Sequence, residues 1–242
     1  MSAESLKGLV ISETGSGEAD KYITILTETE GKVTLLARGA KKPSSKIMSA
    51  ARVFNYGEFF YFKGRGFNSL NSADVLEGFY DIQNDYEKLA YASFILEAAD
   101  RTAYGDTAEL LRLVLYSLTA MAKTNISPKI IACAFKFKLL DIMGFFNAEG
   151  ECLNCGRDEA VFFSVLGGGL VCRECRSRFP DSFPISTGAK KAIKYISESE
   201  LKRIFSFNAS ESVVDELWNI SDRSIRQHIS REFKTDKIIK TL

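Results

Sequence analysis

The sequence predicts an α+β protein with an N-terminal β-barrel, a following helical domain and a four-cysteine zinc module inserted in that domain. Three observations predict this class. Residues 6–80 form short, alternating apolar runs separated by turn-forming residues, as strands do. Residues 85–146 change to the period of amphipathic helices. Four of the five cysteines then fall into two C-x2-C pairs, which is the spacing of a four-thiolate zinc site.

Five strands are expected within the first eighty residues. Five strands joined by long loops are compatible with an OB-fold barrel, so residues 1–80 are expected to form an OB-fold domain. A small barrel needs large side chains inside it, and we expect Phe54, Phe60 and Phe62 to belong to its core. The expected strands are 6–11, 22–27, 32–38, 52–63 and 68–76.

The segment 81–150 is expected to form a bundle of three helices. Ser127 and Pro128 provide an N-cap and a first-turn proline for the third helix, and Gly144 ends it. Residues 185–242 follow a helical pattern again and are expected to pack on this bundle. No apolar stretch approaches the roughly 20 residues that span a bilayer, so no membrane partner is expected.

The cysteine pattern predicts a structural zinc module over residues 151–184. Each C-x2-C turn places two sulfurs on one side of a tight loop, and two such turns complete a tetrahedron around one Zn²⁺. Four thiolates leave no open position for water, which favours a structural role over a catalytic one. A glycine-rich hairpin is expected between the two turns. The predicted ligands are Cys152, Cys155, Cys172 and Cys175.

Two other interpretations of the cysteines are a pair of disulfides and a redox C-x-x-C motif. Disulfides require an oxidising compartment, but residues 1–7 contain no apolar signal segment, so a cytoplasmic protein is expected. A redox motif would explain one pair and leave the other without a role. Cys133 lies apart in an apolar run and is expected to be a buried, inert thiol.

A strongly basic segment lies inside a chain whose net charge is only +1. Residues 32–65 carry eight lysines and arginines against a single acid, Glu58. Cations beside an aromatic-rich sheet suit single-stranded nucleic acid, because they follow the phosphates while rings can stack on bases. An ordinary solvated surface is the alternative. The predicted phosphate contacts are Arg38, Lys41, Lys42, Lys46, Arg52, Lys63 and Arg65.

Catalytic arrangements are scarce in this sequence. Its single histidine, His228, lies in a polar helical stretch and is expected to be solvated or packed. Gly15-Ser16-Gly17 is not followed by the Gly-Lys-Ser/Thr of a P-loop, and it precedes a strand. No catalytic residue is therefore assigned, and an enzyme is not expected. The basic residues of 189–242 could be an ordinary helical surface or a supplementary DNA contact.

Several motifs together resemble the RecO family of recombination mediators. The resemblance is carried by residues 18–27 and 37–44, by 138–146 running into 152–156, and by 168–172. It implies a non-enzymatic, nucleoid-associated DNA-repair factor that binds single- and double-stranded DNA and anneals complementary strands. It further implies that the protein acts with RecR to help RecA displace single-strand-binding protein, whose acidic C-terminal tail it contacts. The C-terminal helices match only loosely.

A second function class remains open from the residues alone. The barrel and the zinc module could be scaffolds for a helical docking face, which would make the chain a non-enzymatic protein–protein adaptor. Binding to single-stranded DNA at moderate salt distinguishes the two, because an adaptor needs no nucleic acid.

Overall fold

The structure is a computed structural model that describes residues 3–147 and 150–242. The described chain divides into two compact units. The N-terminal unit contains the residues before 90 together with 96–112, and the C-terminal unit contains 90–95 together with 113–242.

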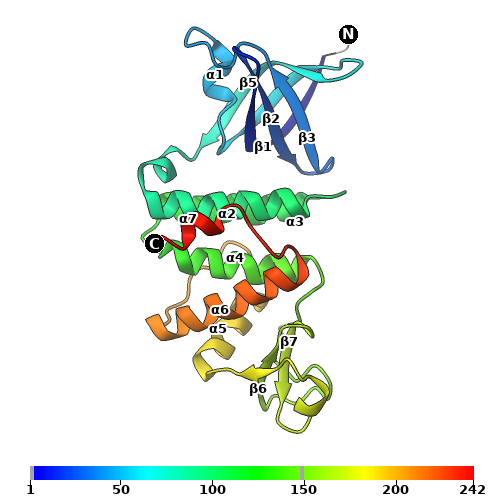
Figure 1. The fold of residues 1–242 in the computed structure, drawn as a ribbon, viewed down its shortest axis with the longest axis vertical. Helices are drawn as coiled ribbons and strands as arrows, with labels where there is room; N and C mark the ends of the chain where they lie inside the picture. The colour runs from blue at the N-terminus through cyan, green and yellow to red at the C-terminus, as the bar shows by residue number, and fades with distance from the viewer. Residues whose placement is uncertain (1–2, 148–149) are drawn as a thin grey trace. The chain divides into compact units, whose positions relative to one another are not determined.

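The N-terminal unit is built on a closed five-stranded barrel with the strand order β1-β2-β3-β5-β4 (Figure 1). Consecutive strands pair antiparallel, except that β3 and β5 run parallel where the barrel closes. This confirms the predicted OB-like barrel. Its strands are β1 (Ala3–Ser16), β2 (Asp20–Thr27), β3 (Lys32–Ala37), β4 (Asn55–Phe62) and β5 (Asn68–Gly78).

Strand β1 pairs with both β2 and β4, and so joins the two sides of the barrel. A register shift between Val10 and Ser12 lets it bend from one partner to the other. Gly8 lies opposite Gly57 of β4 at this crossing. A Cβ on Gly8 would collide with the carbonyl oxygen of Leu26, so only glycine allows the backbones to approach this closely.

The barrel core is made by the inward side of each strand. Burial alternates along β4, so that Phe59 and Tyr61 point inward while Phe60 and Phe62 lie on the outer side and are only partly buried. The expectation that Phe60 and Phe62 are core residues is therefore wrong, although Phe54 is buried as expected. The core cluster consists of Leu6, Val10, Ile23, Ile25, Leu35, Ala37, Ala40, Ala51, Phe59, Tyr61 and Leu70.

The helical domain follows the barrel along the chain, with α2 and α3 contributing residues to both units. In the C-terminal unit α4 packs against α5 and α6 (Figure 1). Most of its residues are buried, which explains its nearly continuous apolar sequence. The α-helices are α1 (Lys46–Ala50), α2 (Tyr86–Thr102), α3 (Ala108–Lys123), α4 (Pro128–Ile142), α5 (Thr187–Glu198), α6 (Glu211–His228) and α7 (Asp236–Ile239), and the short 3-10 turns are η1 (Tyr80–Asn84) and η2 (Arg176–Arg178).

The signals that bound α4 act as the sequence predicts. Pro128 occupies the first turn, where its missing N–H has no intrahelical partner to lose. Gly144 follows the helix with φ +73°, a left-handed conformation that ends helices and favours glycine. No helix in the described part of the chain is long and apolar enough to cross a membrane.

A small sheet with the order β7-β6-β8 carries the cysteines. Its strands are β6 (Ala160–Ser164), β7 (Gly169–Cys172) and β8 (Phe183–Pro184). The β6–β7 turn is held by the Asp181 carboxylate, which accepts hydrogen bonds from Ser164 Oγ at 2.9 Å and Leu166 N at 2.8 Å. Gly168 adopts φ +67° in this turn, and a Cβ there would collide with the carbonyl oxygen of Phe145. The predicted glycine hairpin is confirmed.

Candidate nucleic-acid interface and metal centre

The four predicted metal ligands come together in the C-terminal unit. The sulfurs of Cys152, Cys155, Cys172 and Cys175 all lie within 4.8 Å of one another. Four sulfurs at about 2.3 Å from one tetrahedral ion lie about 3.8 Å apart. The Sγ atoms of Cys155 and Cys172 are separated by 3.8 Å, too far for a disulfide, and all five cysteines are free thiols. The cluster therefore has the size of a four-thiolate metal site.

Backbone hydrogen bonds shape the first cysteine turn and fasten it to the sheet. The Gly156 N–H donates to the carbonyl of Cys152 at 2.9 Å, and the Cys152 N–H donates to the carbonyl of Arg157 at 2.8 Å. The Leu153 N–H donates to the carbonyl of Leu170 in β7 at 2.8 Å. Because β7 ends at Cys172, this bond sets the first pair of sulfurs against the second.

One asparagine orients the site from outside the ligand set. Asn154 Nδ2 donates to Cys175 Sγ at 3.2 Å, while its Oδ1 accepts a hydrogen bond from Arg178 Nη1 at 2.7 Å. A donor to a coordinating sulfur stabilises its thiolate form, and Arg178 fixes which way the amide faces. The C-x2-C spacing alone gave no reason to single out either residue.

The thiols of the cluster differ in how readily they ionise. Burial acts to raise the pKa of Cys152, but hydrogen bonds from the backbone at Cys172, Asn154 and Cys155 outweigh it and lower the pKa to about 6. Burial raises the pKa of Cys175 to about 12, and hydrogen bonds with the neighbouring thiols act in the same direction. A divalent ion offsets the cost of ionising a thiol such as that of Cys175, because it stabilises all four thiolates together. These four cysteines could thus hold a metal ion. Cys133 is not part of the cluster: it is buried in α4, and burial raises the pKa of its thiol to about 11.

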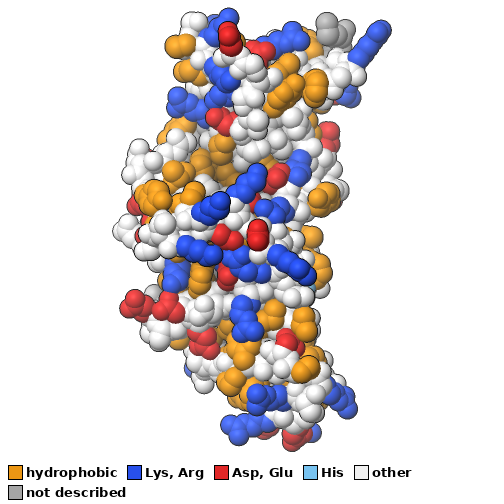
Figure 2. Space-filling view, in the orientation of Figure 1, with side chains coloured by type: hydrophobic (Ala, Val, Ile, Leu, Met, Phe, Trp, Pro, Cys, Tyr) orange, Lys and Arg blue, Asp and Glu red, His pale blue; other side chains and the backbone are white. Residues whose placement is uncertain are grey.

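The seven predicted phosphate contacts all have exposed side chains in the N-terminal unit. Arg38 follows the last residue of β3, and Lys41 and Lys42 lie in the turns after it. Lys46 begins α1, Arg52 lies between α1 and β4, and Lys63 and Arg65 lie in the loop from β4 to β5. On the face of the barrel seen in Figure 2, Lys and Arg side chains lie beside hydrophobic ones.

The basic loop after β3 is more ordered than a glycine- and serine-containing segment suggests. The Gly39 N–H donates to Asp20 Oδ1 at 2.8 Å, and the Lys41 N–H donates to the carbonyl of Ala19 at 2.9 Å. Lys41 Nζ donates to the carbonyl of Gly17 at 2.7 Å. These bonds hold the loop backbone against the turn between β1 and β2. The backbone from which the lysine side chains extend is therefore fixed.

Carboxylates compensate few of these cations. Lys63 Nζ pairs with Glu4 of β1 at 2.8 Å, and this ammonium lowers the pKa of the Glu4 carboxyl. Counting charges along residues 32–65 could not find this pair, because Glu4 lies far away in the sequence. The pairing of β1 with β4 places Glu4 opposite Tyr61, close to Lys63. Among the described residues, no ion pair is formed by Arg38, Lys42, Lys46, Arg52 or Arg65.

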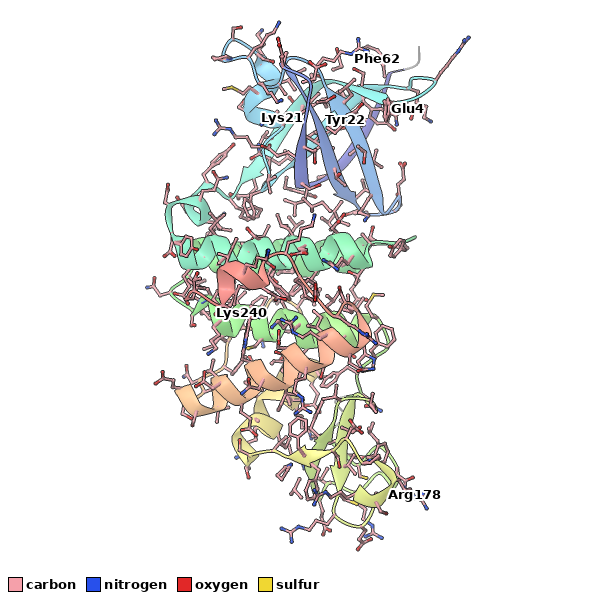
Figure 3. All side chains as sticks on the ribbon, viewed as in Figure 1. Glu4, Lys21, Tyr22, Phe62, Arg178 and Lys240 are labelled. Carbon is pink, nitrogen blue, oxygen red and sulfur yellow. The ribbon has the colours of Figure 1, made fainter. Side chains whose placement is uncertain are left out.

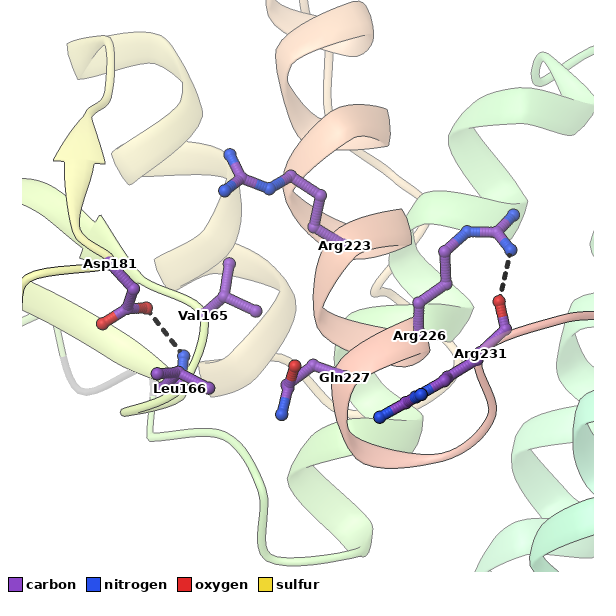
Figure 4. A pocket seen from close by; sticks show the side chains of 7 residues that line it. All are labelled: Val165, Leu166, Asp181, Arg223, Arg226, Gln227 and Arg231. Carbon is purple, nitrogen blue, oxygen red and sulfur yellow. Dashed lines mark hydrogen bonds between the residues drawn. The ribbon is translucent and has the colours of Figure 1, made fainter.

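A second cationic feature is a cleft of about 540 Å³ in the C-terminal unit (Figure 4). Its lining includes Arg223, Arg226 and Arg231 of α6 and the segment after it. Arg226 is neutralised by Asp222 and Asp236, with contacts at 2.7 and 2.8 Å. The Arg223 guanidinium lies 4.4 Å from the centre of the Phe183 ring, and it leaves a charge available to an anion at the cleft.

His228 is packed against neighbouring residues, which is one of the two environments that the sequence predicts for it. Its ring stacks on Phe145 with 5.0 Å between centroids and 17° between planes. Its Nε2 lies 2.7 Å from the carbonyl oxygen of Val165, in the hairpin turn. The ring thus joins the end of α6 to the cysteine-bearing sheet.

Known proteins resemble this chain over nearly its whole length. The family model described as Recombination protein O N terminal matches residues 1–79, and the one described as Recombination protein O C terminal matches residues 83–237. The DNA repair protein RecO of Acetivibrio thermocellus is 38% identical over 97% of this chain and 95% of its own length. The DNA repair proteins RecO of a Thermoanaerobacter species (28% identical, 98% of this chain and 96% of the relative) and of Bacillus subtilis (26%, 96% and 92%) are also similar. With the two family models covering residues 1–79 and 83–237, the chain belongs to the RecO family of DNA repair proteins.

Proposed function

We propose that this chain is a non-enzymatic recombination mediator that binds single- and double-stranded DNA through its barrel. The observation that carries the proposal is the set of exposed barrel cations, six of which lack a carboxylate partner among the described residues, although Lys41 donates to the carbonyl of Gly17. Unpaired cations on a small barrel release counterions when they contact phosphates, and that release drives binding. We assign the phosphate contacts to Arg38, Lys41, Lys42, Lys46, Arg52, Lys63 and Arg65.

Strand annealing follows from the same chemistry. A barrel that neutralises the phosphates of two strands lowers their repulsion, while the bases remain free to pair. The arginine cleft near α6 is a candidate for a supplementary phosphate contact, since Arg223 and Arg231 carry no ion pair among the described residues. The protein would work in the cytoplasm at the nucleoid.

We further propose that the metal at the cysteine cluster is a structural Zn²⁺. A site with four thiolates is saturated and suits an ion that carries no substrate. Two of the cysteines precede β6 and two lie at or just after the end of β7, so one ion bound by all four would join the two ends of the hairpin. The cluster lies in the C-terminal unit, whereas the proposed phosphate contacts lie in the N-terminal unit.

The partners named by the family resemblance belong to the same proposal. They are RecR, the acidic C-terminal tail of single-strand-binding protein and, indirectly, RecA. The test is a titration of labelled single-stranded DNA with the full chain at increasing salt, repeated with single-strand-binding protein and RecR present. We expect binding that weakens steeply with salt, and binding to coated strands when RecR is added. Absence of DNA binding at moderate salt would favour the protein–protein adaptor instead.

A further inference from the structure

The outer side of the barrel carries a row of side chains that crosses four strands. Tyr22 of β2 is paired with Leu36 of β3, Leu36 with Ser69 of β5, and Ser69 with Phe62 of β4. Paired residues in neighbouring strands point to the same face of a sheet. We call these four residues the outer row.

Burial confirms which face the outer row occupies. Its four members are all partly exposed. Their chain neighbours on the inner side, namely Ile23, Leu35, Tyr61 and Leu70, are buried in the barrel core. Figure 3 labels Tyr22 and Phe62 on the strands of the barrel. Two aromatic rings of one face are therefore directed away from the core.

A third ring extends the outer row into the loop before β5. Phe67 is 61% exposed, and the centre of its ring lies 5.2 Å from that of Tyr22 with 53° between their planes. A phenylalanine with this exposure contributes little to the core of the barrel. Phe67 and Tyr22 together offer ring surface to anything that binds this side of the barrel.

The proposed phosphate contacts lie among these rings along the chain. Arg38 directly follows β3, two residues after Leu36. Lys63 directly follows Phe62, and Arg65 is two residues before Phe67. Rings with cations close by suit single strands, because bases can stack on the rings while the cations contact the phosphates.

We propose that Tyr22, Phe62 and Phe67 form a base-stacking platform for single-stranded nucleic acid, next to the phosphate contacts of the barrel. This rests on the proposed function and adds to it a preference for single strands. In a duplex the base faces are stacked on each other and are closed to these rings, whereas the phosphates remain available. Duplex binding should therefore use the cations alone.

The experiment compares three labelled oligonucleotides of equal length with the full-length wild type and the Y22A/F67A variant. They are an oligothymidylate, an abasic strand with the same phosphates, and a duplex. Alanine substitution of a stacking ring costs about 1–3 kcal/mol per base, so the variant should bind oligothymidylate about 5- to 150-fold more weakly for each base that loses its stacking. Its affinity for the abasic strand and the duplex, and the salt slope for each, should stay the same.

The matched control is Y104A, because Tyr104 is another exposed tyrosine of the N-terminal unit, at 75% exposure, outside the outer row. It should bind all three ligands as the wild type does. If the double variant unfolds, F67A alone serves, since its side chain is already exposed. Equal affinity of the wild type for oligothymidylate and the abasic strand would overturn the platform while leaving phosphate binding intact. A wild type that binds none of the three would overturn the proposed function as well.

Discussion

The ammonium of Lys136 lies 3.3 Å from the centre of the Trp218 ring, inside the C-terminal unit. The side chain is completely buried, and the Phe94 ring lies 4.9 Å away. Its carboxylate partner is Asp222, whose Oδ1 is 3.3 Å from Nζ and whose Oδ2 is 2.7 Å from Arg226 Nε. Burial lowers the pKa of Lys136 from 10.5 to about 8, although the charge of Asp222 opposes this shift. Attraction to the faces of the aromatic rings compensates in part for the hydration that the ammonium loses on burial.

Lys136 should make the stability of the C-terminal unit depend on pH. Between about pH 8 and 10.5 the unfolded chain holds a proton on this lysine that the folded chain has lost, so stability rises with pH. The gain is at most roughly 3 kcal/mol. Trp218 is the single tryptophan of the chain, so its fluorescence can follow urea unfolding at pH 7.5 and pH 9.5.

Comparison with K136M separates this effect from other groups that titrate in the same range, including the nearby Cys133 thiol. Methionine keeps the apolar length of the side chain, and Asp222 keeps its Arg226 partner. The variant should lose the rise in stability between the two pH values. An equal rise in both proteins would show that Lys136 is not its source.

Replacing one cysteine of the cluster should release the metal and loosen the fold before it affects DNA binding. Mutating a residue that only contacts a ligand typically lowers metal affinity by up to roughly 100-fold. C152S removes a ligand itself, so we expect a larger loss of metal affinity and a lower melting temperature. The measurements are metal content after dialysis, melting temperature and DNA affinity. C133S, which alters the separate buried thiol, should keep its metal. A C152S protein with full zinc and unchanged stability would contradict the assignment.

Asn154 should tune the metal site without being a ligand. Its amide donates to Cys175 Sγ and is oriented by Arg178. N154A removes this donor, and the metal affinity should fall about 10- to 100-fold, measured by competition with a chelator. N208A changes an exposed asparagine between α5 and α6; it is the control and should bind metal like the wild type. Identical affinities for N154A and the wild type would mean that the hydrogen bond to sulfur has no effect.

Glu4 should weaken DNA binding in the wild type, because its carboxylate pairs with Lys63. E4Q removes the charge and keeps the shape, so Lys63 becomes available to a phosphate. Affinity for DNA should rise, and the slope of log affinity against log salt should steepen by about one. E13Q removes a carboxylate that pairs with Lys21 and serves as the control; the slope should not change. A weaker or unaltered affinity in E4Q would remove Lys63 from the phosphate contacts.

Local signals in the sequence were sufficient for much of this fold. The proline and glycine that bound α4 act within one turn, and the C-x2-C spacing defines its own loop geometry. Both therefore predict structure without knowledge of distant contacts. The four cysteines came together as predicted for the same reason, since the intervening hairpin is short.

Features that depend on the register between distant strands could not be predicted. Alternation along β4 shows that Phe60 and Phe62 share a face, but only pairing with β1 and β5 makes that face the outer one. The ion pair between Glu4 and Lys63 has the same origin. The burial of Lys136 depends on packing between helices that are distant in the sequence. In the sequence alone, this lysine cannot be distinguished from an ordinary surface residue.

If cations of the barrel bind DNA phosphates, affinity for DNA must depend on salt through these side chains. The affinity of the full chain for labelled single-stranded DNA is measured over a range of salt for the wild type, K41E/K42E/K46E and K41R/K42R/K46R. Because Lys41 also holds the loop through Gly17, K42E/K46E is included as a variant that keeps this bond.

Each lost contact reduces the slope of log affinity against log salt by about 0.7 on single strands. We expect K41E/K42E/K46E to bind more weakly than the wild type, with a slope smaller by about two. K42E/K46E should lie between the two, and K41R/K42R/K46R should behave like the wild type. The same affinity and the same slope in the wild type and both glutamate variants would contradict phosphate binding by these lysines.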